Sequence, residues 1–215
     1  MTINPEIIPL FKDISEKDLD AMLRCLGAYE RDYRKGEFIS LAGENQRMIG
    51  VVLRGEVHMI KEDYWGGVSL YAFIHQTEIF GETFACGNPK NSSVSFKASL
   101  NSSILFLDFD KILRTCESCC VFHRKLIDNM VGVIAAKNRQ MMDKLEILSQ
   151  KTIRQRILLY LSERAAPDGD YADFPAGRLE MADYLCVDRS AMTREMNHMR
   201  EDGILDFDRI KFRLK

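Results

Sequence analysis

The stretch RLEMADYLCVDRSAMTREMNHMREDGIL, residues 178–205, decides how the C-terminal part of this chain is interpreted. It predicts two helices, Arg178 to Leu185 and about Arg189 to Glu201, joined by a tight turn. Asp188 is placed to cap the second helix, and Gly203 to end it. A short helix, a turn and a longer helix form the helix-turn-helix pattern, whose second helix enters the major groove of DNA.

The predicted second helix carries one face that suits DNA. Arg189, Ser190, Thr193 and Arg194 share that face, whereas the methionines of the helix turn to the other side. Arginine can donate two hydrogen bonds to guanine, and small hydroxyl residues allow close approach. The residues expected at DNA are Arg178, Arg189, Ser190, Thr193, Arg194 and Lys211. The alternative interpretation is an ordinary solvated helix of mixed charge.

The last residues, GILDFDRIKFRLK (203–215), alternate like a small hairpin and predict a basic wing beside the phosphate backbone. Residues 151–215 hold 12 Lys and Arg and 12 Asp and Glu, so this segment is neutral overall. Because non-specific affinity scales with the phosphates neutralised, we expect it to be modest and concentrated on the second helix and the wing.

The middle of the chain predicts a β structure. From about Tyr33 to Phe109, short β-branched and aromatic runs such as IGVVLRGEVHMIK and SSILFLDF are separated by glycines. Closely spaced strands with glycine corners favour a barrel or roll. The chain is long enough, and at 46% hydrophobic residues apolar enough, to bury a core in each of two domains.

Residues 119–149 predict one long helix. They contain no proline, and apolar residues recur at a seven-residue step, at Ile127, Ile134, Met141 and Leu148. Such a seam on an otherwise polar helix favours a homodimer that pairs along it, although Lys137 and Asn138 interrupt the stripe. The alternative is a helix that packs only on its own β structure.

This order of parts resembles the CRP/FNR family of bacterial transcription regulators over nearly the whole chain. The motifs that carry the resemblance are LAGE, VLRGEV, IFGE, IRQRILLYL and LCVDRSAMTREMNHMREDGIL. It implies an α+β fold with a jelly-roll-like β-roll at 1–118, a dimerisation helix at 119–150 and a winged helix-turn-helix at 151–215. It also implies an effector bound between roll and helix, a homodimer on a palindromic operator, and RNA polymerase as a partner.

The resemblance implies an effector, but the residues at the expected binding positions do not suit cyclic AMP. Cyclic-AMP-binding members supply an Arg-Ser pair to the phosphate and a Thr-Ser pair to the adenine. A gapless placement puts Ser92-Ser93 and Met141-Met142 at these positions, so a charge-assisted contact to the phosphate is lost. The expected effector-binding residues are Gly81, Glu82, Thr83, Phe84, Ser92, Ser93, Lys137, Met141 and Met142.

Two interpretations of this lining remain open. A small apolar or aromatic effector, with Lys137 reaching any anionic group, fits the soft methionines. Equally, the protein's own side chains fill the pocket, and the paired methionines are core. Gly81 and Glu82 then only shape the turn of the roll.

The six cysteines support a rival hypothesis, a redox or metal sensor. Cys116, Cys119 and Cys120 form one C-x-x-C pair plus one more thiol, which falls short of four ligands without a further cysteine. The four histidines show no ligand spacing. We therefore expect no metal and no cofactor.

Other function classes lack support in the sequence. No nucleophile elbow or phosphate-binding P-loop is present, so no enzymatic activity is expected. Neither a signal peptide nor an apolar run of about 18 residues occurs, which predicts a cytoplasmic protein without a membrane partner. A ligand-binding module that regulates a protein rather than DNA is the remaining alternative.

Overall fold

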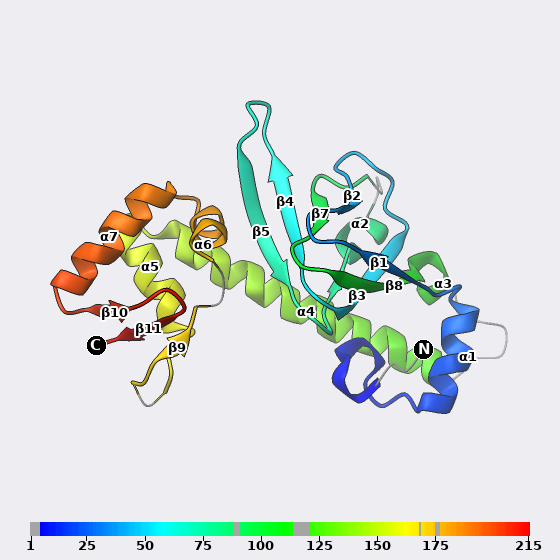
Figure 1. Cartoon of the computed structure of the whole chain (residues 1–215). Coiled ribbons are helices and arrows are strands. Elements are labelled where there is room, and N and C mark those ends of the chain that lie inside the picture. Colours follow the sequence, from blue (N-terminus) through cyan, green and yellow to red (C-terminus); the bar gives the residue numbers. More distant parts are fainter. Residues whose placement is uncertain (1–4, 88–90, 114–120, 168, 175–176) are drawn as a thin grey trace. The chain divides into compact units, whose positions relative to one another are not determined.

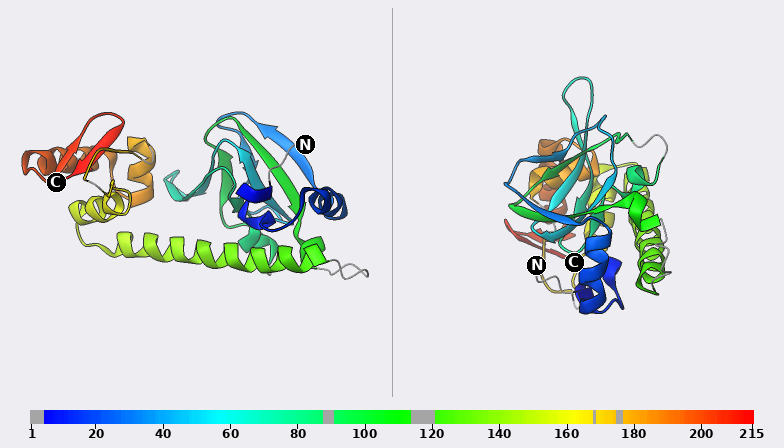
Figure 2. Two further views of the ribbon diagram at one scale, coloured as in Figure 1. Left: turned by 90° about the horizontal axis from the view of Figure 1, so that it is seen from below. Right: turned by 90° about the vertical axis from the view of Figure 1, so that its right-hand side faces the viewer.

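The computed structural model describes residues 5–87, 91–113, 121–167, 169–174 and 177–215 (Figure 1). It divides into two compact units, Met1–Lys137 and Asn138–Lys215. The boundary falls within the long helix α4 (Val121–Ser149), which appears as one continuous helix in Figure 2. The dimerisation helix expected at 119–150 therefore contributes residues to both units.

The first unit is the expected β-roll, made of two four-stranded antiparallel sheets. Their strand orders are β1-β8-β3-β6 and β2-β7-β4-β5. The strands are β1 (Tyr29–Tyr33), β2 (Phe38–Ser40), β3 (Met48–Arg54), β4 (Val57–Glu62), β5 (Val68–Ile74), β6 (Ile79–Phe80), β7 (Ser95–Ala98) and β8 (Ser102–Asp108). The central strands β3 and β8 are formed by the apolar runs noted in the sequence. Continuous apolar residues suit these strands, because both faces of each strand are covered.

Two apolar clusters form the core of this unit. One includes Val52, Phe80, Phe96 and Phe106 and gathers residues of both sheets. The other lies beneath the first sheet and adds the helical segments of the unit. These are η2 (Pro9–Phe11), α1 (Glu16–Cys25), α2 (Glu82–Ala85), α3 (Phe109–Leu113) and the first half of α4, whereas the short η1 (Pro5–Ile7) precedes η2 outside the cluster. The second cluster fixes the start of α4 to the roll.

The second unit is a winged helix-turn-helix. Its helices are α5 (Ile153–Ser162), α6 (Arg178–Leu185) and α7 (Arg189–Glu201). Its sheet has the order β10-β11-β9, from β9 (Ala172–Asp173), β10 (Leu205–Phe207) and β11 (Lys211–Leu214). Met192, Met196 and Met199 of α7 are fully buried, as the sequence pattern predicts. Among the described residues, no helix is both long and apolar enough to cross a membrane.

Candidate functional site

The Gly81–Glu82 turn is built into the interior of the roll. Gly81 has φ +84°, and a Cβ there would lie 2.8 Å from Gln46 Nε2 and 3.1 Å from the Met48 carbonyl oxygen. Only glycine fits this left-handed and crowded position without strain. The chain then starts α2 directly, so the Glu82 side chain is held buried at the beginning of that short helix.

Glu82 and Lys137 form a largely buried ion pair. Glu82 Oε1 lies 2.9 Å from Lys137 Nζ, and the two side chains are 7% and 25% exposed. The other carboxylate oxygen, Oε2, is buried and accepts no hydrogen bond from the described residues. The sequence suggests that Lys137 reaches an anionic group of an effector, but in the structure its ammonium binds this internal carboxylate.

The other effector-site residues of the roll are mostly engaged locally. The buried Ser92 hydroxyl donates to the Val94 carbonyl at 2.6 Å and accepts from the Val94 amide at 3.2 Å, so it forms a turn. Ser93 is exposed. Thr83, also exposed, donates its hydroxyl to Glu82 Oε1 at 3.4 Å. Phe84 packs against the core between the sheets.

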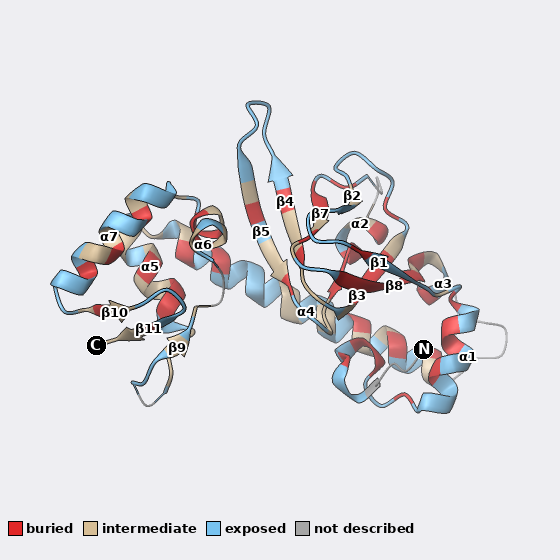
Figure 3. Ribbon diagram, in the orientation of Figure 1, coloured by how far each residue is buried: buried red, intermediate tan, exposed pale blue. Residues whose placement is uncertain are grey.

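The helix α4 presents two different faces (Figure 3). Leu126 and Met130 are buried in the core of the roll, and Val133 packs against it. A neighbouring face carries the predicted seam. There Ile127 and Leu148 are half-buried, and the large exposed side chains are Val131, Ile134, Met141, Met142 and Leu145. Packing on the roll and an exposed apolar seam, which the sequence left as alternatives, thus occur together on different faces.

The exposed face of α7 carries the predicted DNA contacts. Asp188 caps the helix by accepting from the Ala191 amide at 2.8 Å. It also accepts from the Ser190 hydroxyl at 2.5 Å, and these bonds lower the pKa of Asp188. Thr193 donates to the Arg189 carbonyl at 2.8 Å. Arg189 and Arg194 are exposed, and neither guanidinium has a hydrogen bond or ion pair within the described residues.

Arg178 departs from its expected role at DNA. Its guanidinium lies over the rings of Phe174 and Phe207, at 3.8 and 5.1 Å from their centroids, and donates to the Asp208 carbonyl at 3.1 Å. Burial lowers the pKa of Arg178. The side chain thus joins α6 to the wing. Lys211, by contrast, is exposed; its backbone is bound by Asp208, and its ammonium has no hydrogen bond or ion pair within the described residues.

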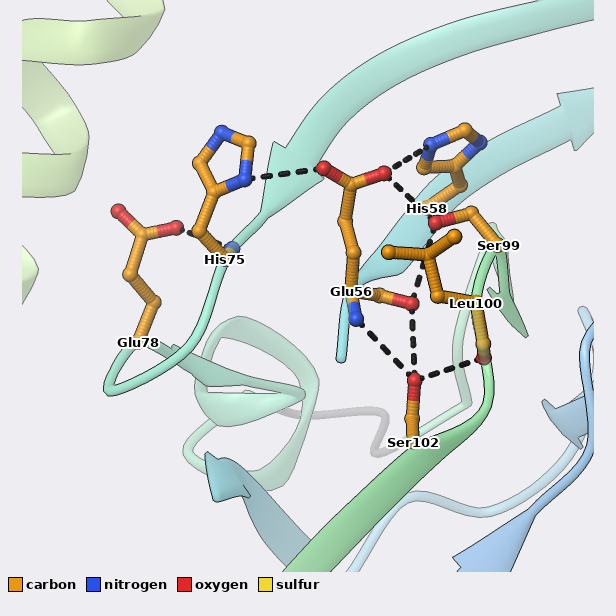
Figure 4. A network of polar contacts seen from close by, with 7 residues as sticks. All are labelled: Glu56, His58, His75, Glu78, Ser99, Leu100 and Ser102. Atoms are coloured by element: carbon orange, nitrogen blue, oxygen red, sulfur yellow. Dashed lines mark hydrogen bonds and ion pairs between the residues drawn. The ribbon is translucent and has the colours of Figure 1, made fainter. Parts of the chain in front are cut away.

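A polar network at the base of the β4–β5 hairpin was not found from the sequence (Figure 4). The Glu56 carboxylate accepts from His58 and from His75, each at 3.0 Å, and from the Ser99 hydroxyl at 2.6 Å. The Ser102 hydroxyl binds the Glu56 backbone. Two of the histidines, which show no metal-ligand spacing in the sequence, thus bind a carboxylate.

The cysteines described by the structure form no site. Cys25, Cys86 and Cys186 are free and exposed. Within the described ranges, no group of three or more histidine, cysteine, aspartate or glutamate side chains is arranged to hold a metal ion. Cys116, Cys119 and Cys120, on which the sensor hypothesis depends, lie outside the described residues.

Comparison with known proteins shows which proteins share this architecture. Residues 30–119 match the cyclic nucleotide-binding domain family. FixK2 from Bradyrhizobium japonicum is 23% identical with a TM-score of 0.65, over 87% of this chain and 92% of that one. The c-di-GMP-responsive global regulator CLP from Xanthomonas campestris is 16% identical with a TM-score of 0.74, over 92% and 99%. TTHA1359 from Thermus thermophilus, a CRP/FNR family transcriptional regulator, is 15% identical with a TM-score of 0.62, over 87% and 93%.

The chain has the CRP/FNR fold. The resemblance noted from LAGE, VLRGEV and IFGE is confirmed, since these motifs lie within the matched cyclic nucleotide-binding domain. The CRP/FNR fold also accounts for the winged unit, because the structural matches extend over nearly the whole chain. No curated protein matches this sequence.

Proposed function

We propose that this chain is a transcription regulator that binds DNA through α7 and the wing β10–β11. The observation that carries the proposal is the pair of exposed arginines on α7, Arg189 and Arg194, whose guanidinium groups have no hydrogen bond or ion pair within the described residues. Guanidinium groups left free on a helix capped by Asp188 are available to base edges and phosphates. The regulators with the same fold support this assignment.

The regulator acts as a homodimer on a palindromic operator. The support is the exposed apolar seam of α4, where Val131 is 62% and Leu145 69% exposed. Apolar surface of this extent on one helix face is typical of an interface. Because two-fold symmetry of the protein is mirrored in the site, we infer two half-sites in successive major grooves. RNA polymerase is the protein partner of such a regulator.

The effector domain does not respond to cyclic AMP. The Ser92 hydroxyl is used in its own turn, and the Glu82 carboxylate is paired with Lys137, so no free cation is described at this turn for a phosphate. A small apolar or aromatic effector suits the site better. We expect millimolar cyclic AMP to leave both the melting temperature and the DNA affinity unchanged, as measured by thermal shift and fluorescence anisotropy. A saturable shift contradicts this assignment of the site.

Selection of operators from random DNA tests the proposed function directly. The full-length wild-type protein should enrich a two-fold symmetric motif, and a variant with both Arg189→Ala and Arg194→Ala should enrich none. A wild-type protein that is folded and enriches no sequence, either alone or with small aromatic effectors added, contradicts DNA regulation. That result favours the alternative of a module acting on a protein partner.

A further inference from the structure

The first half of α4 is fixed to the roll by a series of contacts. The His123 imidazole donates to the Ile112 carbonyl at 2.9 Å, and Asn129 Nδ2 donates to the carbonyls of Leu10 and Lys12 at 3.1 and 2.8 Å. Leu126 and Met130 are buried between these positions. This part of the helix has no freedom to shift without disturbing the core.

The ion pair of Lys137 with Glu82 lies farther along α4 than these anchors. The compact β-roll unit ends at Lys137, so the pair joins roll and helix at the point where α4 leaves the roll. The roll side of the contact is rigid, because Gly81 and the start of α2 fix the Glu82 backbone. The ion pair therefore helps to set the orientation of α4 at this point.

The Glu82–Lys137 ion pair is also costly to break. A buried carboxylate that loses its cation is left uncompensated, and breaking such a pair from one side is strongly unfavourable. One oxygen, Glu82 Oε2, already lacks a hydrogen-bond partner among the described residues. A molecule that donates hydrogen bonds to both carboxylate oxygens satisfies Oε2 and competes with Lys137 for Oε1.

We propose that the Glu82–Lys137 ion pair is a built-in latch that holds the protein in its DNA-binding state without any ligand. Lys137 supplies from within the chain the cation that fixes α4 to the effector site, and an effector acts by displacing Lys137 from Glu82. Effectors of this site are therefore small apolar or aromatic molecules that carry hydrogen-bond donors, and they release DNA. The latch rests on the proposed function, because its output is DNA binding.

Variants of Lys137 test the latch in the full-length protein without added ligand. Lys137→Ala and Lys137→Met should weaken binding to the selected operator by about tenfold or more, within the usual range of allosteric coupling. Propylammonium chloride should restore binding by Lys137→Ala, because it returns an ammonium to Glu82. It should not restore Lys137→Met, whose side chain fills the same space. Potassium chloride at equal ionic strength is the salt control.

Two further variants keep the test independent of folding defects. Lys125→Ala removes an ammonium from the same helix, one that donates to the Asp13 carbonyl at 2.6 Å rather than to a buried carboxylate. It should bind DNA as the wild type does. The double reversal Glu82→Lys with Lys137→Glu should bind more tightly than either single reversal, because it re-forms the pair.

The outcomes separate the latch from the proposed function. Equal operator affinity of the wild type, Lys137→Ala and Lys137→Met, all melting cooperatively, overturns the latch and leaves DNA binding intact. A wild type that binds its operator only when a ligand is added overturns it as well. A wild type that selects no operator either with or without added ligand removes the proposed function itself.

Discussion

Individual arginines of α7 have different tasks. Arg200 lies over the Phe207 ring at 4.9 Å and donates to Asn197 at 3.2 Å, so the fold uses its guanidinium. Arg189 and Arg194 have no such partner within the described residues. Since Arg194 lies one turn beyond Ser190 on the exposed face, we assign base readout to it.

Substitution of Arg194 tests this assignment. Arg194→Ala should weaken binding to the cognate operator by about 1–3 kcal/mol and relax the preference at one base pair of each half-site. Operator selection with the variant measures both effects. Arg200→Ala, on the same helix, should recover the wild-type motif. If Arg194→Ala recovers that motif with equal stringency, the base-reading role belongs to another residue.

Glu56 is a single residue on which four segments of the roll converge. Hydrogen bonds from His58 and then His75, with a further one from Ser99, hold the pKa of Glu56 well below its ordinary value of 4.5. A carboxylate whose pKa is lower in the folded state stabilises the protein above its unfolded pKa. That contribution is lost as the pH falls towards the folded pKa.

Glu56→Gln should therefore destabilise the protein near neutral pH by about 1.5–3 kcal/mol, the worth of hydrogen bonds to a charged group. Urea denaturation at a series of pH values measures the difference from the wild type. We expect that difference to persist at pH 5 and to shrink below about pH 4.5. Glu62→Gln, at an exposed position of β4, serves as the control. A difference that stays constant down to pH 3 argues against the ionised carboxylate as its source.

At the scale of elements, the wing is positioned by a side chain that the sequence assigned to DNA. Arg178 packs over the rings of Phe174 and Phe207, whereas the Lys211 ammonium has no hydrogen bond or ion pair within the described residues. Each phosphate contact contributes nearly one unit to the dependence of log affinity on log salt concentration. The two residues should therefore differ in their effect on that slope.

Lys211→Ala should lower the salt slope by about 1 and weaken all DNA sequences alike. Arg178→Met should leave the slope unchanged and lower the free energy of unfolding by about 1 kcal/mol or more, because it removes the hydrogen bond to Asp208. Anisotropy titrations at several salt concentrations, with urea denaturation, separate these effects. A reduced salt slope in Arg178→Met indicates instead that Arg178 contacts the phosphate backbone.

The sequence predicted those elements whose signals are local. Asp188 caps α7 through an amide only three residues away, and the methionines of α7 follow one helical period. The contacts that it missed join distant residues. Glu82 and Lys137 are 55 positions apart, and Glu56 and Ser99 are 43 apart. Neither spacing carries a periodic signal, because only the closed roll brings these residues together.

At the scale of the whole molecule, α4 is the element expected to join two copies. One of its faces is already covered by the roll through Leu126 and Met130, so the seam is not needed to close the core of that unit. The seam includes Ile134, 39% exposed, and Met141, 44% exposed. Exposed apolar side chains repeating along one helix face are stabilised by pairing with the same face of a second copy.

Ile134→Glu combined with Met141→Glu should therefore yield monomers, because the paired helices would bury like charges against apolar surface. These monomers should lose affinity for the palindromic operator, since each presents only one recognition helix. Sedimentation at micromolar concentration, with anisotropy on the operator, measures both changes. Gln140→Glu, at an exposed position on another side of α4, should remain a dimer. A wild type that sediments as a monomer at micromolar concentration contradicts the dimer, and with it the two-fold symmetric operator.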